Sequence, residues 1–98
     1  MAYEVNFLGY NCILNFGQYA NGRTAIQLID VEDGAPVAIA TVNVPEYDLA
    51  ADEVVIKSYS ENIGVLDALI NANIVRETGR FVNTGYISAP VCKLLVSV

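Results

Sequence analysis

The chain has 98 residues, which is enough for one domain and too few for two, so we expect a single domain over residues 1–98. Hydrophobic residues make up 54% of it and charged residues 16%, a balance that excludes an intrinsically disordered protein. Eleven acidic and five basic residues give a net charge of −6, which argues against direct binding of nucleic-acid phosphates. There is no histidine, so the commonest general base and the commonest metal ligand are both missing.

The same composition argues against a membrane protein. No run of residues reaches the roughly 18 uncharged apolar residues that a membrane-spanning helix needs. The first ten residues contain an acid, Glu4, and no basic residue, which is not the pattern of a secretory signal. We therefore expect a cytoplasmic protein that makes no contact with a membrane.

Four runs of β-forming residues in the first half of the chain are separated by short turn signals. Asn21-Gly22 favours a type I′ hairpin turn because both residues tolerate positive φ, and Asp33-Gly34 is a second turn signal. Loops this short connect only antiparallel strands, so the pattern predicts an antiparallel meander. The expected strands are Tyr3–Leu8, Cys12–Tyr19, Thr24–Val31 and Val37–Val44.

The hydrophobic period changes once in the second half of the chain. After an acidic loop at Glu46–Asp52 and a short strand at Glu53–Lys57, apolar residues recur at helical spacing over Glu61–Asn71. This spacing predicts one helix of about three turns.

Residues with capping side chains flank this expected helix. Ser58 and Glu61 fit a capping box at its start, and Ser60 is the alternative N-cap. Asn73 suits the left-handed residue that often follows the end of a helix.

Short β-forming runs return at the end of the chain. Pro90 indicates a bend or an edge position there. The expected fold is therefore α+β, with an antiparallel sheet of five to seven strands that begins as a meander and is covered by one helix. The last expected elements are a small hairpin of Ile74-Val75 and Arg80–Val82 around the turn Glu77–Gly79, then strands at Tyr86–Ser88 and Val91–Val96.

The residues that usually carry chemistry form no recognisable pattern. Cys12 and Cys92 each lie in an apolar run, so we expect two buried free thiols, with a disulfide between them as the alternative. A phosphate-binding loop is absent, and the acidic turn Asp30–Gly34 lacks the spacing of a calcium loop. Ser60 has no base at the spacing of a known nucleophile motif. We therefore expect no catalytic residue, no metal site and no cofactor.

Charge is distributed unevenly along the chain. Between Asp30 and Asp67 there are nine acidic residues and one basic residue, Lys57. Two interpretations remain open: the acids keep an apolar chain in solution, or they form one negative surface that fits a basic groove in place of phosphates. On the second interpretation the candidate partner-binding residues are Asp30, Glu32, Asp33, Glu46, Tyr47, Asp48, Asp52 and Glu53.

Three motifs form a signature: the run Tyr19–Leu28, the pair Glu32–Gly34 with Thr41–Pro45, and the run Ile56–Asn62. Together they resemble an uncharacterised family of small proteins encoded by phages, plasmids and other mobile elements. The resemblance covers about residues 12–95 and transfers no functional residue. What it implies is context, since small acidic proteins of mobile elements are often inhibitors of host defence, and anti-CRISPR proteins are the best-studied kind of this size.

Three hypotheses about function follow. We predict a non-enzymatic inhibitor that binds a host defence nucleoprotein, such as a CRISPR effector, through the acidic surface and blocks access of nucleic acid, with Tyr47 as an anchor. The second hypothesis is a small interaction module of a mobile element that forms a homodimer through Val91–Val98. The third is an enzyme that uses carboxylates or Ser60, which would need a concave pocket with convergent polar groups.

Overall fold

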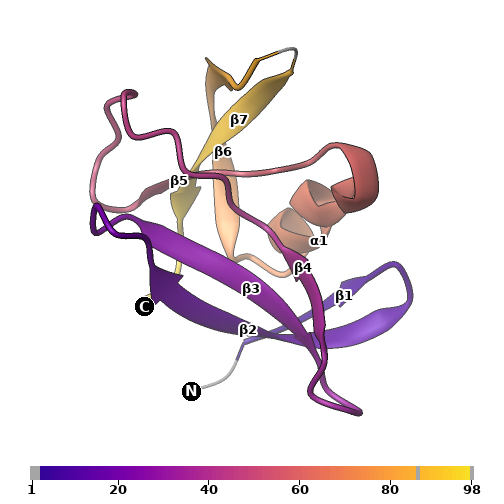
Figure 1. Cartoon of the computed structure of the whole chain (residues 1–98). Coiled ribbons are helices and arrows are strands. Elements are labelled where there is room, and N and C mark those ends of the chain that lie inside the picture. Colours follow the sequence, from indigo (N-terminus) through magenta and orange to yellow (C-terminus); the bar gives the residue numbers. More distant parts are fainter. Residues whose placement is uncertain (1–2, 86, 98) are drawn as a thin grey trace.

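The computed structural model describes residues 3–85 and 87–97, and its elements confirm an α+β fold made mostly of antiparallel strands (Figure 1). The expected single sheet is wrong, because the strands of the described residues form a four-stranded sheet and a three-stranded sheet. In chain order the elements are β1 (Glu4–Phe7), β2 (Tyr10–Gln18), β3 (Thr24–Asp30), β4 (Pro36–Ile39), β5 (Glu53–Val55), the 3-10 turn η1 (Ser60–Asn62), α1 (Val65–Asn71), β6 (Val75–Asn83) and β7 (Ser88–Leu94).

The first sheet is the expected meander, with strand order β1-β2-β3-β4 and antiparallel pairing throughout. Successive side chains of a strand point to opposite faces of the sheet. Val5, Leu14 and Leu28 therefore lie in the core, while Asn15 and Gln27, which are paired across β2 and β3, lie on the outer face.

The first predicted hairpin turn of this sheet differs in type from the expected one. Asn21-Gly22 does lie in the β2–β3 hairpin, but only Gly22 has a positive φ, of 85°, and its N–H donates to the Tyr19 carbonyl over 2.9 Å. The Tyr19 N–H also donates to the Arg23 carbonyl over 2.8 Å, so a three-residue loop, Ala20–Gly22, replaces the expected type I′ turn. A two-residue loop with both φ angles positive occurs instead at Leu8-Gly9, between β1 and β2.

The second sheet has the order β5-β7-β6 and corrects the interpretation of the last quarter of the chain. The expected hairpin over residues 74–82 is one continuous strand, β6. The residues predicted as a turn lie instead in a register shift between Glu77 and Phe81, where Gly79 has a φ of 87°. A β-bulge accommodates such extra residues without reversing the chain.

The last two expected strands are also one strand, β7, and it is the central strand of its sheet. Pro90 lies inside β7 rather than at an edge or a bend. It lies one residue beyond the last β5–β7 pair, which is Val55 opposite Val91. Its carbonyl accepts the Ile56 N–H over 3.0 Å. Its missing N–H therefore costs the ladder only a terminal bond. Tyr86, with which one of the expected strands begins, lies outside the described residues.

The chain between β4 and β5 joins the two sheets. Thr41 forms an isolated bridge with Ile56, and the Lys57 N–H donates to the Ala40 carbonyl over 2.7 Å. The Thr41 hydroxyl accepts the Ile26 N–H over 3.2 Å. A side chain thus replaces a backbone carbonyl as the partner of β3 at the point where the segment after β4 turns away from it. The expected strand Val37–Val44 therefore divides here between the two sheets.

The helix is shorter than expected and begins later. It starts at Val65, after Gly64, whose φ of 96° cannot continue a helix from the preceding η1 turn. The N-cap residues of η1 and α1 are Tyr59 and Gly64, and neither makes a side-chain capping hydrogen bond. The expected caps at Ser58 and Ser60 are therefore wrong, and the side chain of Glu61 lies outside the described part of the chain.

The end of the helix is as expected. Asn73 has a φ of 60°, its N–H donates to Ile70, and the Ile74 N–H donates to Leu69. These two bonds form a Schellman motif, which satisfies the last carbonyls of the helix. Leu69 and Ile74 are both buried, which supplies the apolar contact that accompanies the motif.

The helix contacts β1 and β6, which are edge strands of the two different sheets. Figure 1 shows α1 between these strands, closing the gap that the sheets leave open. The main core is formed by buried side chains of α1 and of both sheets. A second, smaller core lies on the other face of the β5-β7-β6 sheet. The second core consists of Val44, Val55, Val82, Ala89 and Val91, with Val42, Tyr47, Leu49 and Tyr59 packed against it.

Candidate functional site

The structure divides the eight candidate partner-binding residues into three groups instead of bringing them onto one surface. Figure 1 places the β3–β4 turn at the bottom of the molecule and the loop before β5 at its upper left, so the two acidic segments lie at opposite ends. The expected single acidic face is therefore wrong, because the chain crosses from one sheet to the other between these segments. The groups are Asp30, Glu32 and Asp33 in the β3–β4 turn, Glu46, Tyr47 and Asp48 in the loop, and Asp52 and Glu53 at the start of β5.

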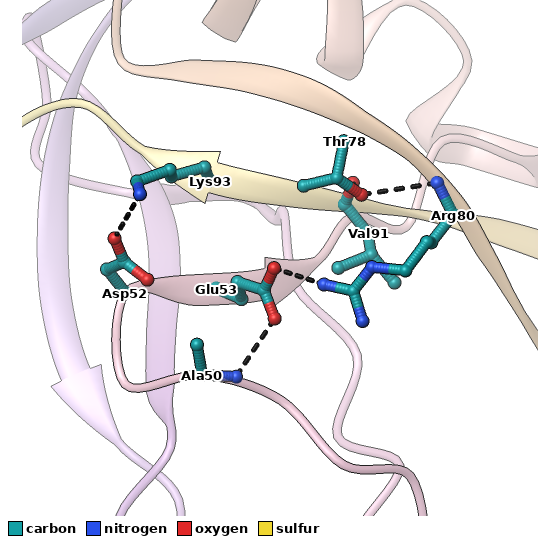
Figure 2. A network of polar contacts seen from close by, with 7 residues as sticks. All are labelled: Ala50, Asp52, Glu53, Thr78, Arg80, Val91 and Lys93. Atoms are coloured by element: carbon teal, nitrogen blue, oxygen red, sulfur yellow. Dashed lines mark hydrogen bonds and ion pairs between the residues drawn. The ribbon is translucent and has the colours of Figure 1, made fainter.

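The acids at the start of β5 are paired with cations of the same sheet, as Figure 2 shows. Glu53 forms an ion pair with Arg80 and also accepts the Ala50 N–H over 2.9 Å. The hydrogen bond from Arg80, followed by that from Ala50, lowers the pKa of Glu53. Asp52 lies 3.1 Å from the Lys93 ammonium. These two carboxylates already have partners within the chain.

The bulge in β6 brings Arg80 to Glu53. Within the bulge, the Thr78 hydroxyl donates to the Val91 carbonyl over 2.8 Å and accepts the Arg80 N–H over 3.2 Å (Figure 2). The hydrogen bond to Glu53 in turn raises the pKa of Arg80. This network links β5, β6 and β7 of the second sheet.

Tyr47 belongs to the second core rather than to an exposed contact surface. Its side chain is half-buried against that core, and its carbonyl accepts a hydrogen bond from Arg23. A second Arg23 nitrogen donates to the Val44 carbonyl over 2.6 Å. Glu46 and Asp48, on either side of Tyr47, are exposed and have no ion-pair partner among the described residues.

Two of the sequence motifs hold each other in place. From the β2–β3 hairpin, Tyr19 bonds to the Thr41 hydroxyl over 2.8 Å and Asn21 donates to the Asn43 side chain over 3.2 Å. Together with Arg23, these side chains fasten the chain segment that links the two sheets. The signature residues of these motifs therefore have a structural explanation.

The turn between β3 and β4 is held by its own carboxylates. Asp30 accepts the Glu32 N–H over 2.9 Å, and Asp33 accepts the Ala35 N–H over the same distance. Gly34, with a φ of 72°, completes the turn. None of the three acids has a cationic partner among residues 3–85 and 87–97. This turn therefore presents three carboxylates whose charge no described side chain compensates.

A groove of about 400 Å³ lies beside this turn. One wall comes from the β1–β2 hairpin and the other from the segment that enters β4, and Asp30 and Asp33 belong to its lining. A depression of about 250 Å³, lined by residues that include Tyr10, Asp30 and Glu32, adjoins it through the residues the two share. The apolar lining of the groove consists of Phe7, Leu8, Tyr10, Ala35, Pro36 and Val37.

None of the candidate partner-binding residues lies in the β1–β2 hairpin, although this hairpin contributes to the groove. Leu8 is 66% exposed and Tyr10 is 50% exposed, although both lie in or beside expected strands. The signal that could have found them is the dipeptide Leu8-Gly9, where a turn places a large apolar residue at a position with φ of 53°.

The thiols are buried and free, as expected. Burial, and to a smaller extent the nearby Asp30, raises the pKa of Cys12. Burial and Glu77 raise the pKa of Cys92 to about 12. A thiol with a raised pKa is a poor nucleophile at neutral pH. Within the described residues no three His, Cys, Asp or Glu side chains are grouped as a metal site requires, and no helix combines the length and apolar character that spanning a membrane demands.

The segment proposed for a homodimer does not offer a free strand edge over residues 91–94. These residues belong to β7, which pairs with β5 on one side and β6 on the other. The backbone of Val91–Leu94 therefore has no free edge that could pair with a strand of a second copy.

The fold and site thus define a small α+β protein, made mostly of antiparallel strands, with a groove beside one of its acidic turns. Comparison with known proteins gives no match: no family model matches the chain, and no curated protein and no solved structure is significantly similar to it.

Proposed function

We propose that this protein is a non-enzymatic inhibitor that binds a basic surface of a host defence nucleoprotein through its β3–β4 turn. The observation that carries the proposal is the set of three carboxylates in this turn that have no cationic partner among the described residues. The resemblance to small proteins of mobile elements supports a CRISPR effector as the nucleoprotein.

The mechanism is occlusion of a nucleic-acid site. Lysine and arginine side chains that normally hold phosphates would pair with Asp30, Glu32 and Asp33, which project from one turn. The net charge of −6 accelerates association with a basic surface, because opposite fields steer the encounter. Binding of this kind weakens as salt is added.

The remaining acids support the choice of this turn. Asp52 and Glu53 are engaged by Lys93 and Arg80, so a partner would have to break existing ion pairs to reach them. Glu46 and Asp48 are exposed, but Tyr47 between them packs against the second core. Among the described acids without a cationic partner, those of the β3–β4 turn lie beside a groove.

The test is a phage plaque assay in a host with an active CRISPR system and in the same host without it. Wild-type protein is expected to restore plaques only in the first host. The triple variant Asp30→Asn, Glu32→Gln, Asp33→Asn keeps acceptors for the turn hydrogen bonds but removes the charge, and should lower inhibition about tenfold or more.

The matched control is Glu4→Gln, Glu46→Gln, Asp48→Asn, which changes net charge equally at exposed positions elsewhere. It should inhibit like the wild type. An equal loss in both triple variants would show that net charge alone matters. A wild-type protein without effect in hosts of several CRISPR types would reject the inhibitor proposal.

A second candidate function, a homodimeric accessory module, is favoured by the outer face of the first sheet. Across its outward strand positions Glu4 is the only charged side chain among the described residues. Side-chain amides pair there, Asn6 with Asn11 and Asn15 with Gln27, and amides can equally pair with a second copy. Sedimentation equilibrium distinguishes the two: a tight dimer supports the module, and a monomer supports the inhibitor.

A further inference from the structure

The groove beside the acidic turn has an apolar floor and walls. Phe7 is almost fully buried at its base, whereas Leu8 and Tyr10 are at least half exposed on one wall. Pro36 and Val37 form the opposite wall. Exposed apolar side chains gathered around a concave surface are typical of a contact site for another protein.

The position of Leu8 adds to this argument. A turn with both φ angles positive favours Asn or Gly, and an L-residue with a large side chain is disfavoured there by about 1–2 kcal/mol. Leu8 nevertheless occupies the position with φ of 53° and turns its side chain to solvent. Folding does not require a leucine at this place, and a contact with a partner does explain it.

The groove and the depression beside it are also lined by acidic side chains. Asp30 and Asp33 belong to the lining of the groove, and Asp30 and Glu32 line the adjoining depression. An apolar depression with negative charge at its mouth is complementary to an apolar side chain that has cations beside it. It disfavours a nucleic acid, whose phosphates the same carboxylates would repel.

We propose that this groove receives one large apolar side chain of a partner protein, flanked by Lys or Arg residues that pair with Asp30, Glu32 and Asp33. The inference rests on the proposed function and adds the kind of segment that the inhibitor recognises. The carboxylates steer and orient the segment, and burial of its apolar side chain between Leu8, Tyr10 and Val37 holds it.

The experiment uses two peptides of equal charge, KRLRK and KRGRK, titrated into ¹⁵N-labelled protein and followed by amide chemical shifts. KRLRK should move the signals of Leu8–Tyr10 and Ala35–Val37 together with those of the acidic turn. It should bind about tenfold or more tightly than KRGRK, because a buried leucine side chain contributes at least that much affinity.

Two variants separate the groove from the rest of the surface. Leu8→Asn suits the turn but removes the apolar wall, so it should reduce KRLRK binding to the level of KRGRK. The matched control is Phe81→Asn, at a β6 position that is 58% exposed and lies outside the groove lining, and it should leave both affinities unchanged.

The outcomes are distinct. Equal binding of the two peptides, with shifts confined to Asp30–Asp33, overturns the groove inference and leaves the proposed function standing. Absence of any shift with either peptide at millimolar concentration overturns both. Shifts of the groove signals that depend on protein concentration alone would assign the groove to a second copy and overturn the inference.

Discussion

The two acidic ends of the molecule differ in what their carboxylates contact. At the start of β5, Asp52 and Glu53 are paired with Lys93 and Arg80 across the second sheet (Figure 2). In the β3–β4 turn, Asp30 and Asp33 accept backbone N–H groups of the same turn, and no described cation pairs with Asp30, Glu32 or Asp33. Acidic residues that look equivalent in the sequence therefore separate into a structural set and a set with uncompensated charge.

The same contrast holds for the turns that flank these acids. The β2–β3 hairpin near the second sheet is fastened to the linking segment by polar side chains, whereas the β1–β2 hairpin carries exposed apolar ones. At one end of the molecule, polar side chains hold the hairpin to the linking segment. At the other end, the hairpin exposes apolar side chains to solvent. Substitutions at the two ends should consequently differ in sign and in size.

The largest effect is expected from Arg23→Met, which removes the side chain that donates to the Val44 and Tyr47 carbonyls. Hydrogen bonds from a charged donor to half-buried carbonyls are strong, and their loss also loosens the cover of the second core. We expect the free energy of unfolding to fall by about 2–3 kcal/mol. Urea denaturation measures it.

The control for this substitution is Arg76→Met, at an exposed position on β6. It removes an equal charge and should change stability by less than about 0.5 kcal/mol. Equal losses in the two variants would show that net charge, rather than the tie to the linking segment, determines the stability of this end.

The opposite sign is expected at the free end. Leu8→Asn places a residue that tolerates positive φ at the first position of the β1–β2 turn. The free energy of unfolding should rise by about 1 kcal/mol, because the strain of a left-handed leucine is relieved. Thermal denaturation followed by circular dichroism measures the change.

Leu8→Val is the informative counterpart, because a β-branched residue is still less compatible with this backbone conformation. It should lower the melting temperature while Leu8→Asn raises it. Two variants that both destabilise would indicate that the leucine side chain contributes to folding, which contradicts its assignment to a binding surface.

The sequence allowed the local elements to be predicted better than their pairing. The meander, the turn at Asp33-Gly34 and the left-handed Asn73 follow from local rules, and the structure confirms them. The sequence around Gly79 indicates a hairpin turn, but a glycine with positive φ serves a turn and a bulge equally well. Only the partner strand β7, which pairs along all of β6 except the bulge, decides between them.

The candidate site shows the same limit. That Asp30, Glu32 and Asp33 share a turn could be predicted, whereas the pairing of Glu53 with Arg80 depends on two strands joined only through β7. The groove depends on the β1–β2 hairpin lying beside that turn, which is also a tertiary property. Charge along the sequence thus indicated where acids occur, and the sheet pairing determined which of them are free.

The smallest effects are expected at the paired end, from Glu53→Gln and Asp52→Asn. The glutamine amide keeps one oxygen, which can accept from Ala50 or from Arg80 but not from both at their present sites, and it loses the charge of a side chain that is only 13% exposed. The free energy of unfolding at pH 7 should fall by about 1 kcal/mol. Asp52→Asn should cost only a few tenths of that, because Asp52 and Lys93 are 47% and 43% exposed.

The pH dependence identifies the source of this loss. The pKa of Glu53 is lowered from its ordinary 4.5 in the folded protein, so its contribution to stability is present above 4.5 and disappears as pH falls through the lower folded-state pKa. The difference between wild type and Glu53→Gln should therefore shrink and then vanish as the pH is lowered below 4.5 and through the folded-state pKa. A difference that persists there would mean that the glutamine disturbs packing instead, and the paired end would owe its stability to shape rather than to charge.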